Sequence, residues 1–147
     1  MLRYQRLILV VLVLSLFCCC DPGYQLHPVG WHASDTWKKQ FRDFEIRTRG
    51  ISGLIGESWV DPDLQVINNK NSISVESADL RTATESFSAE IYDTTDIPPS
   101  KSGYHIPVEW TFDPDRTAPK VLGEHCEIVL NLKVGGERRE IKIQYER

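Results

Sequence analysis

The chain has 147 residues, with 17 Lys and Arg against 21 Asp and Glu, and a formal net charge of −4. This acidic balance argues against nucleic acid or anionic lipid as a partner, because both are recognised by clustered basic side chains. Four cysteines occur and three of them are consecutive, so no disulfide framework is expected and the fold must depend on an apolar core.

The first predicted element is an apolar segment at the N-terminus, residues 7–20. It follows Arg3 and Arg6, contains no charged residue, ends on three consecutive cysteines and is succeeded by Asp21. A basic start, a short apolar stretch and a polar exit are typical of a secretory signal. The stretch is shorter than the about 20 apolar residues that a transmembrane helix needs.

The cysteines at its end make this segment resemble the signal of bacterial lipoproteins, in which a peptidase cuts directly before a cysteine that carries a diacylglyceryl group. Cys20 and Cys19 are the two candidate lipid-attachment residues. Leu16 lies three residues before Cys19, as is usual in that family, whereas Cys20 has small residues directly before it. The resemblance covers residues 1–20 only. It implies a protein anchored to the cell membrane by N-terminal acyl chains, on the extracytoplasmic side, which faces the periplasm in a two-membrane bacterium; Asp21 beside a lipidated Cys20 would imply retention in the inner membrane.

The chemistry of the three cysteines also favours acylation. Adjacent cysteines do not meet the geometry of a disulfide bond with one another, so they need other partners or a modification. Each buried methylene contributes about 0.8 kcal/mol, and two chains give stable anchoring. The alternatives are a secreted protein cut elsewhere and an uncut signal anchor whose cysteines are palmitoylated.

Residues 21–36 are expected to be a tether between the membrane and the domain, because their Pro, Gly, His, Ser and Asp show neither a strand nor a helix period. Trp31 and Trp37 indicate that part of this stretch packs on the domain or at the membrane surface, where amphipathic rings are favoured. His27 and His32 could hold a metal, but no third ligand lies nearby, and exposed histidines are the simpler interpretation.

Residues 37–147 are expected to form a single domain of short strands separated by turns. Alternating apolar residues predict strands within 41–49, 51–60, 64–67, 73–80, 87–92 and 105–112. Trp110 lies in the strongest apolar stripe in the middle of the chain and is predicted to be at the centre of the core. Asp-Pro-Asp occurs at 61–63 and again at 113–115, and both are predicted to be turns.

The C-terminal segment predicts a long β-hairpin. A two-residue glycine turn follows Val134 and pairs that residue with Glu137; counting outward, it pairs Cys126 with Tyr145. The apolar residues of both strands then share one face, and a slip of one residue would expose them all. Cys126 is predicted to be a buried, inert thiol rather than a nucleophile.

Together these features predict an all-β fold, an antiparallel β-sandwich that is immunoglobulin-like in architecture and has about seven to eight strands. The first cysteine of the immunoglobulin signature is absent, so the prediction concerns architecture and not family. A small closed barrel is the alternative.

No motif specifies a catalytic site, and no catalytic residue or cofactor is predicted. The chain lacks a serine nucleophile in a Gly-x-Ser-x-Gly setting, a Gly-rich phosphate loop and a Cys-x-x-Cys pair. His105 and His125 are weak candidate metal ligands, with Glu109 and Glu127 further along the same strands. Solvated histidines are the simpler interpretation, because nothing in the sequence brings the two strands together. The Asp-Pro-Asp turns could offer carboxylates to calcium, but calcium needs six to eight oxygen ligands.

The sequence therefore predicts a membrane-tethered envelope lipoprotein whose non-enzymatic β-sandwich binds another envelope protein or supports an assembly. One alternative is a small-ligand or metal-binding module that uses the histidines. Another is a hydrolase, or an inhibitor of a hydrolase, with acidic working groups, because a pair of catalytic carboxylates has no recognisable spacing in sequence.

Overall fold

The computed structural model of the chain describes residues 23–32, 36–92 and 96–147. The segment predicted to be a signal, with both candidate lipid-attachment residues Cys19 and Cys20, lies outside the described residues. Within the described ranges, none of the helices has the length and apolar character needed to cross a membrane.

Strands are the dominant regular structure of the described residues, which confirms the predicted all-β class. They form fourteen strands and one short helix, more strands than the about seven or eight expected, because Pro, Gly and Asp turns divide the chain into several strands of only two to four residues. The elements are β1 (Gly23–Pro28), β2 (Trp37–Gln40), β3 (Glu45–Thr48), β4 (Ile51–Leu54), β5 (Trp59–Val60), β6 (Leu64–Ile67), β7 (Ile73–Arg81), β8 (Ser86–Ser88), β9 (Glu90–Ile91), β10 (Asp96–Ile97), β11 (Tyr104–His105), β12 (Val108–Thr111), α2 (Ala118–Leu122), β13 (His125–Val134) and β14 (Glu137–Glu146).

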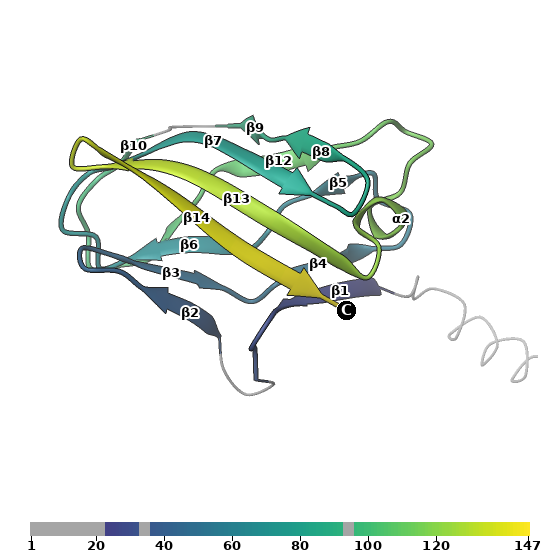
Figure 1. Cartoon of the computed structure of the whole chain (residues 1–147), viewed down its shortest axis with the longest axis horizontal. Coiled ribbons are helices and arrows are strands. Elements are labelled where there is room, and N and C mark those ends of the chain that lie inside the picture. The colour runs from purple at the N-terminus through teal and green to yellow at the C-terminus, as the bar shows by residue number, and fades with distance from the viewer. Residues whose placement is uncertain (1–22, 33–35, 93–95) are drawn as a thin grey trace, which may run out of the picture.

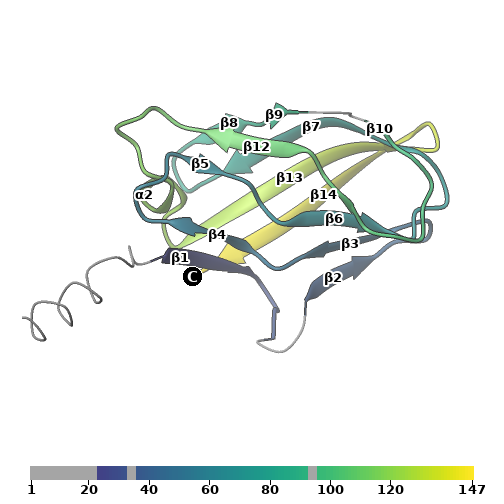
Figure 2. The same cartoon turned by 180° about the vertical axis from the view of Figure 1, so that it is seen from behind.

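The strands form three antiparallel sheets. The first has the order β10-β7-β13-β14-β1-β4, with β8 paired to β7; the second has the order β11-β6-β3-β2, and the third β5-β12-β9. In Figure 1 the long strands β13, β14 and β7 form the near layer, and in Figure 2 β12, β5, β6 and β3 lie in front of them. The first sheet curls at β1 and β4 toward the opposite layer.

The predicted C-terminal hairpin is confirmed with its register. β13 and β14 pair continuously from Val134 with Glu137 to Cys126 with Tyr145, and one pair further. Both turn glycines have positive φ, 56° at Gly135 and 92° at Gly136, the backbone conformation that a two-residue hairpin turn of the primed type requires. The turn chemistry therefore fixes which side chains of the two longest strands enter the core.

Trp110 is confirmed as a core residue, with only 1% of its surface exposed. Its indole N–H donates a hydrogen bond of 2.9 Å to the carbonyl oxygen of Phe87, which satisfies the one polar group of the ring. The Phe87 ring meets that of Phe112 edge to face, with centroids 5.1 Å apart. These contacts join β12, in one layer, to β8. Because β8 is paired to β7, they also connect β12 to the other layer.

The expected tether is wrong for residues 23–28. These residues form β1, which pairs with β4 on one side and with β14 on the other, and Tyr24 and Leu26 are buried. The described domain therefore begins at Gly23 and not at Trp37. The sequence concealed this strand because only two apolar side chains alternate within it, between a glycine and a His-Pro pair.

Candidate functional site

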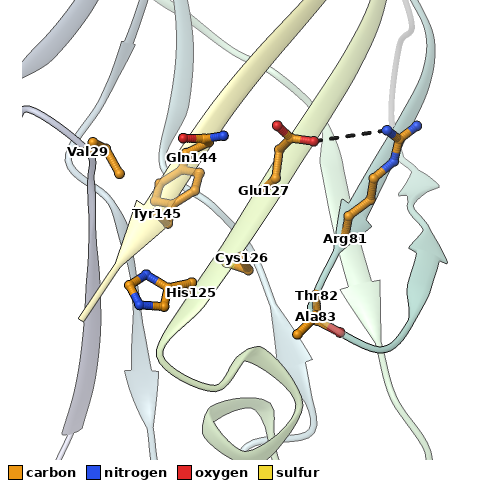
Figure 3. Close-up of a pocket in the computed structure, with 9 residues that line it drawn as sticks. All are labelled: Val29, Arg81, Thr82, Ala83, His125, Cys126, Glu127, Gln144 and Tyr145. Carbon is orange, nitrogen blue, oxygen red and sulfur yellow. Dashed lines mark ion pairs between the residues drawn. The ribbon is translucent and has the colours of Figure 1, made fainter.

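A shallow hollow lies on the outer face of the first sheet, beside the ends of its central strands (Figure 3). Its volume is about 460 Å³. The hollow is lined by Val29, Arg81, Thr82, Ala83, His125, Cys126, Glu127, Gln144 and Tyr145. It is open to solvent and mixes charged, polar and apolar side chains.

Strand pairing brings these residues together from four separate segments. Glu127 of β13 is the Cα partner of Gln144 on β14 and of Arg81 on β7. The backbone N–H of Val29, just after β1, donates a hydrogen bond of 2.8 Å to the carbonyl oxygen of Gln144. A row of side chains therefore crosses the sheet at the height of Glu127, and His125 lies one step further along β13 on the same face.

The two opposite charges in the hollow, the exposed Arg81 and the half-buried Glu127, are only loosely paired. Arg81 Nη1 lies 4.0 Å from Glu127 Oε2, and a surface pair of this kind contributes at most about 1 kcal/mol to stability. Val29 adds an apolar side chain at the rim, with 48% of its surface exposed. The hollow thus offers an acid, a base, an imidazole, an amide and an apolar contact to whatever rests on it.

The floor of the hollow belongs to the core. Cys126 and Tyr145 have the opposite strand parity to Glu127 and Gln144, and both are buried. Burial raises the pKa of the Cys126 thiol to about 12, so the sulfur is a neutral thiol at physiological pH. The prediction that Cys126 is buried is confirmed, and its chemistry is that of a core side chain rather than a nucleophile.

One position on the outer face of the first sheet, Val129, is buried. Val129 has the same parity as Glu127 but is fully buried, lying between its strand partners Lys142 and Asp79. Long polar side chains of neighbouring strands can cover a small apolar residue in this way. The surface beside the hollow is therefore a packed sheet face.

His105 and His125 are on different sheets, on β11 and β13 respectively, and the structure does not bring them together. Within the described residues, no three His, Cys, Asp or Glu side chains converge in a way that would hold a metal ion. Glu109 lies on β12 opposite Glu90, and Glu127 faces Arg81.

His105 instead belongs to a surface cluster that the sequence did not reveal. Its Nε2 lies 2.8 Å from Tyr92 Oη and 3.3 Å from Asp61 Oδ1, and the Tyr92 hydroxyl is 3.4 Å from Asp61 Oδ2. The first Asp-Pro-Asp sequence is an irregular link between β5 and β6 rather than the predicted turn, and its leading carboxylate contacts side chains of two other segments. Because these segments are far apart in sequence, no spacing could have indicated the contact.

The structure also shows the contacts of His27 and of the second Asp-Pro-Asp sequence. The ring of His27 stacks on that of Trp31, with centroids 4.0 Å apart and an angle of 5° between the planes. His27 and His125 are both Cα partners of Glu146, so the three residues form a row across adjacent strands. In the second Asp-Pro-Asp turn, the carbonyl oxygen of Asp113 accepts a hydrogen bond of 2.8 Å from the N–H of Arg116.

Comparison of the chain with protein-family models, with curated proteins and with solved structures gives no match. The class that the fold and the site define is an antiparallel all-β domain with an open polar hollow on one sheet face.

Proposed function

We propose that this chain is a lipid-anchored envelope protein whose non-catalytic β domain binds another protein over the hollow at Val29, Arg81, His125, Glu127 and Gln144. The anchor rests on the resemblance of residues 1–20 to a lipoprotein signal, with Cys20 or Cys19 as the acylated residue. The single observation that supports the binding surface is the open hollow on the first sheet.

The side chains of the hollow suit a protein partner better than a small substrate. Protein interfaces combine apolar contacts with charged and polar rims, and they spread over about 800 Å² on each partner. The hollow supplies the mixed chemistry, and the neighbouring face of β13 and β14 supplies a rigid extension of it. A catalytic site in the hollow would instead need a nucleophile or acid–base pair in mutual hydrogen-bonding distance there, and the thiol of Cys126 is held neutral below its surface.

We also propose that the two layers form an immunoglobulin-like sandwich rather than a closed barrel. The antiparallel pairing and the shared core around Trp110 support it, whereas the curl of the first sheet at β4 is the feature a barrel would share. Amide hydrogen exchange separates the two. In a sandwich, the β4 amides directed away from β1 exchange rapidly, and protection of every β4 amide would favour a barrel.

Site-specific photo-crosslinking in native membranes tests the binding surface. A photoreactive residue at Gln144, inside the hollow, is compared with one at Lys38, an exposed residue on β2 of the second sheet. We expect one protein adduct from position 144 that is absent from position 38, and a several-fold lower yield when Arg81→Glu reverses the charge in the hollow. Identical adducts from both positions, or none from position 144, would reject the surface.

The anchor is tested separately by the intact mass of the protein from the membrane fraction. A chain that begins at Cys20 or Cys19 with a diacylglyceryl group is the expected result. An unmodified chain in the soluble fraction would remove the anchor while leaving the binding surface to be judged by its crosslinks.

A further inference from the structure

Three large apolar side chains are exposed close together in the chain, around the turn between β4 and β5. Leu54, Ile55 and Trp59 expose 50%, 42% and 46% of their surfaces, and we refer to them as the apolar patch. Clusters of exposed apolar residues on a soluble domain commonly mark a contact surface, whereas single ones need no explanation.

The turn that carries the apolar patch is held rigidly. Leu54 N–H donates a hydrogen bond of 2.9 Å to Glu57 Oε2, and Glu57 N–H donates one of 3.1 Å to the carbonyl oxygen of Leu54. A side-chain cap and a backbone bond together fix the loop between the two strands. The apolar side chains are therefore presented in a preformed arrangement.

The chain enters the domain beside this patch. Gly23, the first described residue, is the Cα partner of Leu54 in the pairing of β1 with β4. Figures 1 and 2 show the start of β1, the end of β4 and β5 at the same end of the molecule, opposite the hairpin turn of β13 and β14.

Covalent geometry then limits how far the patch can lie from the anchor. Three Cα–Cα steps of about 3.8 Å separate Cys20 from Gly23, so those Cα atoms are at most about 11 Å apart, and about 15 Å if Cys19 is acylated. Paired strands add about 5 Å to reach Leu54. Because residues 23–28, which were expected to be part of a tether, form β1, only Asp21 and Pro22 separate Cys20 from the folded domain.

From this placement we propose that the apolar patch rests in the headgroup region of the phospholipid bilayer that holds the lipid anchor, so that the domain is docked on the membrane in one orientation. This inference rests on the proposed acyl anchor. The two headgroup regions together account for about 10 to 15 Å of a bilayer 40 to 45 Å thick, so each is about 5 to 7 Å deep. Side chains whose Cα atoms lie within about 16 to 20 Å of an acylated cysteine can reach this region. Indole rings favour that depth, and Leu and Ile add apolar burial.

The charge of the protein points to apolar rather than electrostatic contact. After removal of the signal, with Arg3 and Arg6, the chain keeps 15 basic and 21 acidic residues, a net charge of about −6. Attraction to anionic lipid is therefore not available as the main force. The contact should form on zwitterionic vesicles of phosphatidylcholine and phosphatidylethanolamine and should be insensitive to salt.

Fluorescence quenching by brominated phosphatidylcholine in such vesicles tests the contact, with the full acylated protein reconstituted from native membranes. We expect quenching of tryptophan emission that is largely lost in Trp59→Phe and retained in Trp31→Phe, the matched control at the far end of β1. The double variant Leu54→Ser, Ile55→Ser should reduce the quenching several-fold. All of these side chains are exposed or half-buried, and thermal unfolding by circular dichroism verifies that each variant is folded.

A photoreactive residue at Ile55 identifies what covers the patch, with Lys133 beside the hairpin turn as the control at the opposite end. Adducts with phospholipid at position 55 and not at position 133 are expected. Adducts with a protein or with a second copy of the chain would overturn the proposal, as would quenching that is absent or unchanged in Trp59→Phe. If the protein is acylated but Trp59 is not quenched, only the docking fails; if the protein carries no acyl group, the anchor and the docking fail together.

Discussion

Replacement of Trp110 by alanine should be among the most damaging single substitutions in the domain. The indole is 1% exposed between the two layers, and truncation of a fully buried aromatic ring typically costs about 3 to 5 kcal/mol. Loss of the indole N–H also leaves the carbonyl oxygen of Phe87 without its donor, which adds about 1 kcal/mol if water cannot replace it. We therefore expect the free energy of unfolding of Trp110→Ala to fall by about 4 to 6 kcal/mol.

Two matched variants isolate the cause of that loss. Trp110→Phe keeps an aromatic ring but removes the hydrogen bond, so it should cost less than the alanine variant. Trp59→Ala removes the same side chain from the neighbouring strand β5, where it is 46% exposed, and should cost less than about 1 kcal/mol. Urea unfolding followed by circular dichroism measures all three; a loss below about 1 kcal/mol for Trp110→Ala, or losses of equal size for the two alanine variants, would refute the placement of Trp110 in the core.

Two further predictions follow from ionisable groups. Because burial raises the pKa of Cys126 to about 12, maleimide at pH 8 should leave the peptide that contains it unlabelled in the folded protein and label it in urea; rapid labelling of the native protein, read by peptide mass, would contradict its burial. The hydrogen bond from Arg116 lowers the pKa of Glu85 below its ordinary value of 4.5, so the carboxylate stabilises the fold above pH 4.5 and loses this effect as the pH falls through the lowered pKa. Glu85→Gln should therefore show a flatter dependence of stability on pH below 4.5 than the wild type, and identical slopes would show that the pair does not contribute.

The sequence was sufficient where one local feature determined a long stretch of structure. A two-residue glycine turn fixes the register of both flanking strands, and a period of two then assigns every side chain from Cys126 to Tyr145 to a face. Trp110 was predictable for a related reason, because it lies within four apolar residues at alternate positions. In both cases, the information is contained within about twenty consecutive residues.

The same reasoning failed where structure depends on partners that are distant in sequence. β1 has too few apolar residues to show a period and becomes a strand only because β4 and β14 pair with its two edges. The hollow collects side chains from four segments, and the cluster of Asp61, Tyr92 and His105 joins three more. Their positions follow from strand order, which a single sequence does not reveal.

The finding that residues 23–28 form a strand instead of a tether has the largest consequence for function. A flexible linker of about 16 residues would let the domain sample a wide region above a membrane, with every surface free to meet a partner. With β1 in the sheet, two residues separate Cys20 from the first strand, so under the proposed acylation the end of the domain that carries Leu54 stays beside the anchor. The pairing of β1 with β4 would then set the orientation of the proposed binding surface relative to the membrane. Insertion of a flexible Gly-Ser linker between Pro22 and Gly23 should remove this constraint on orientation. If the crosslinks formed from position 144 depend on docking, the longer linker should weaken them without changing the stability of the domain.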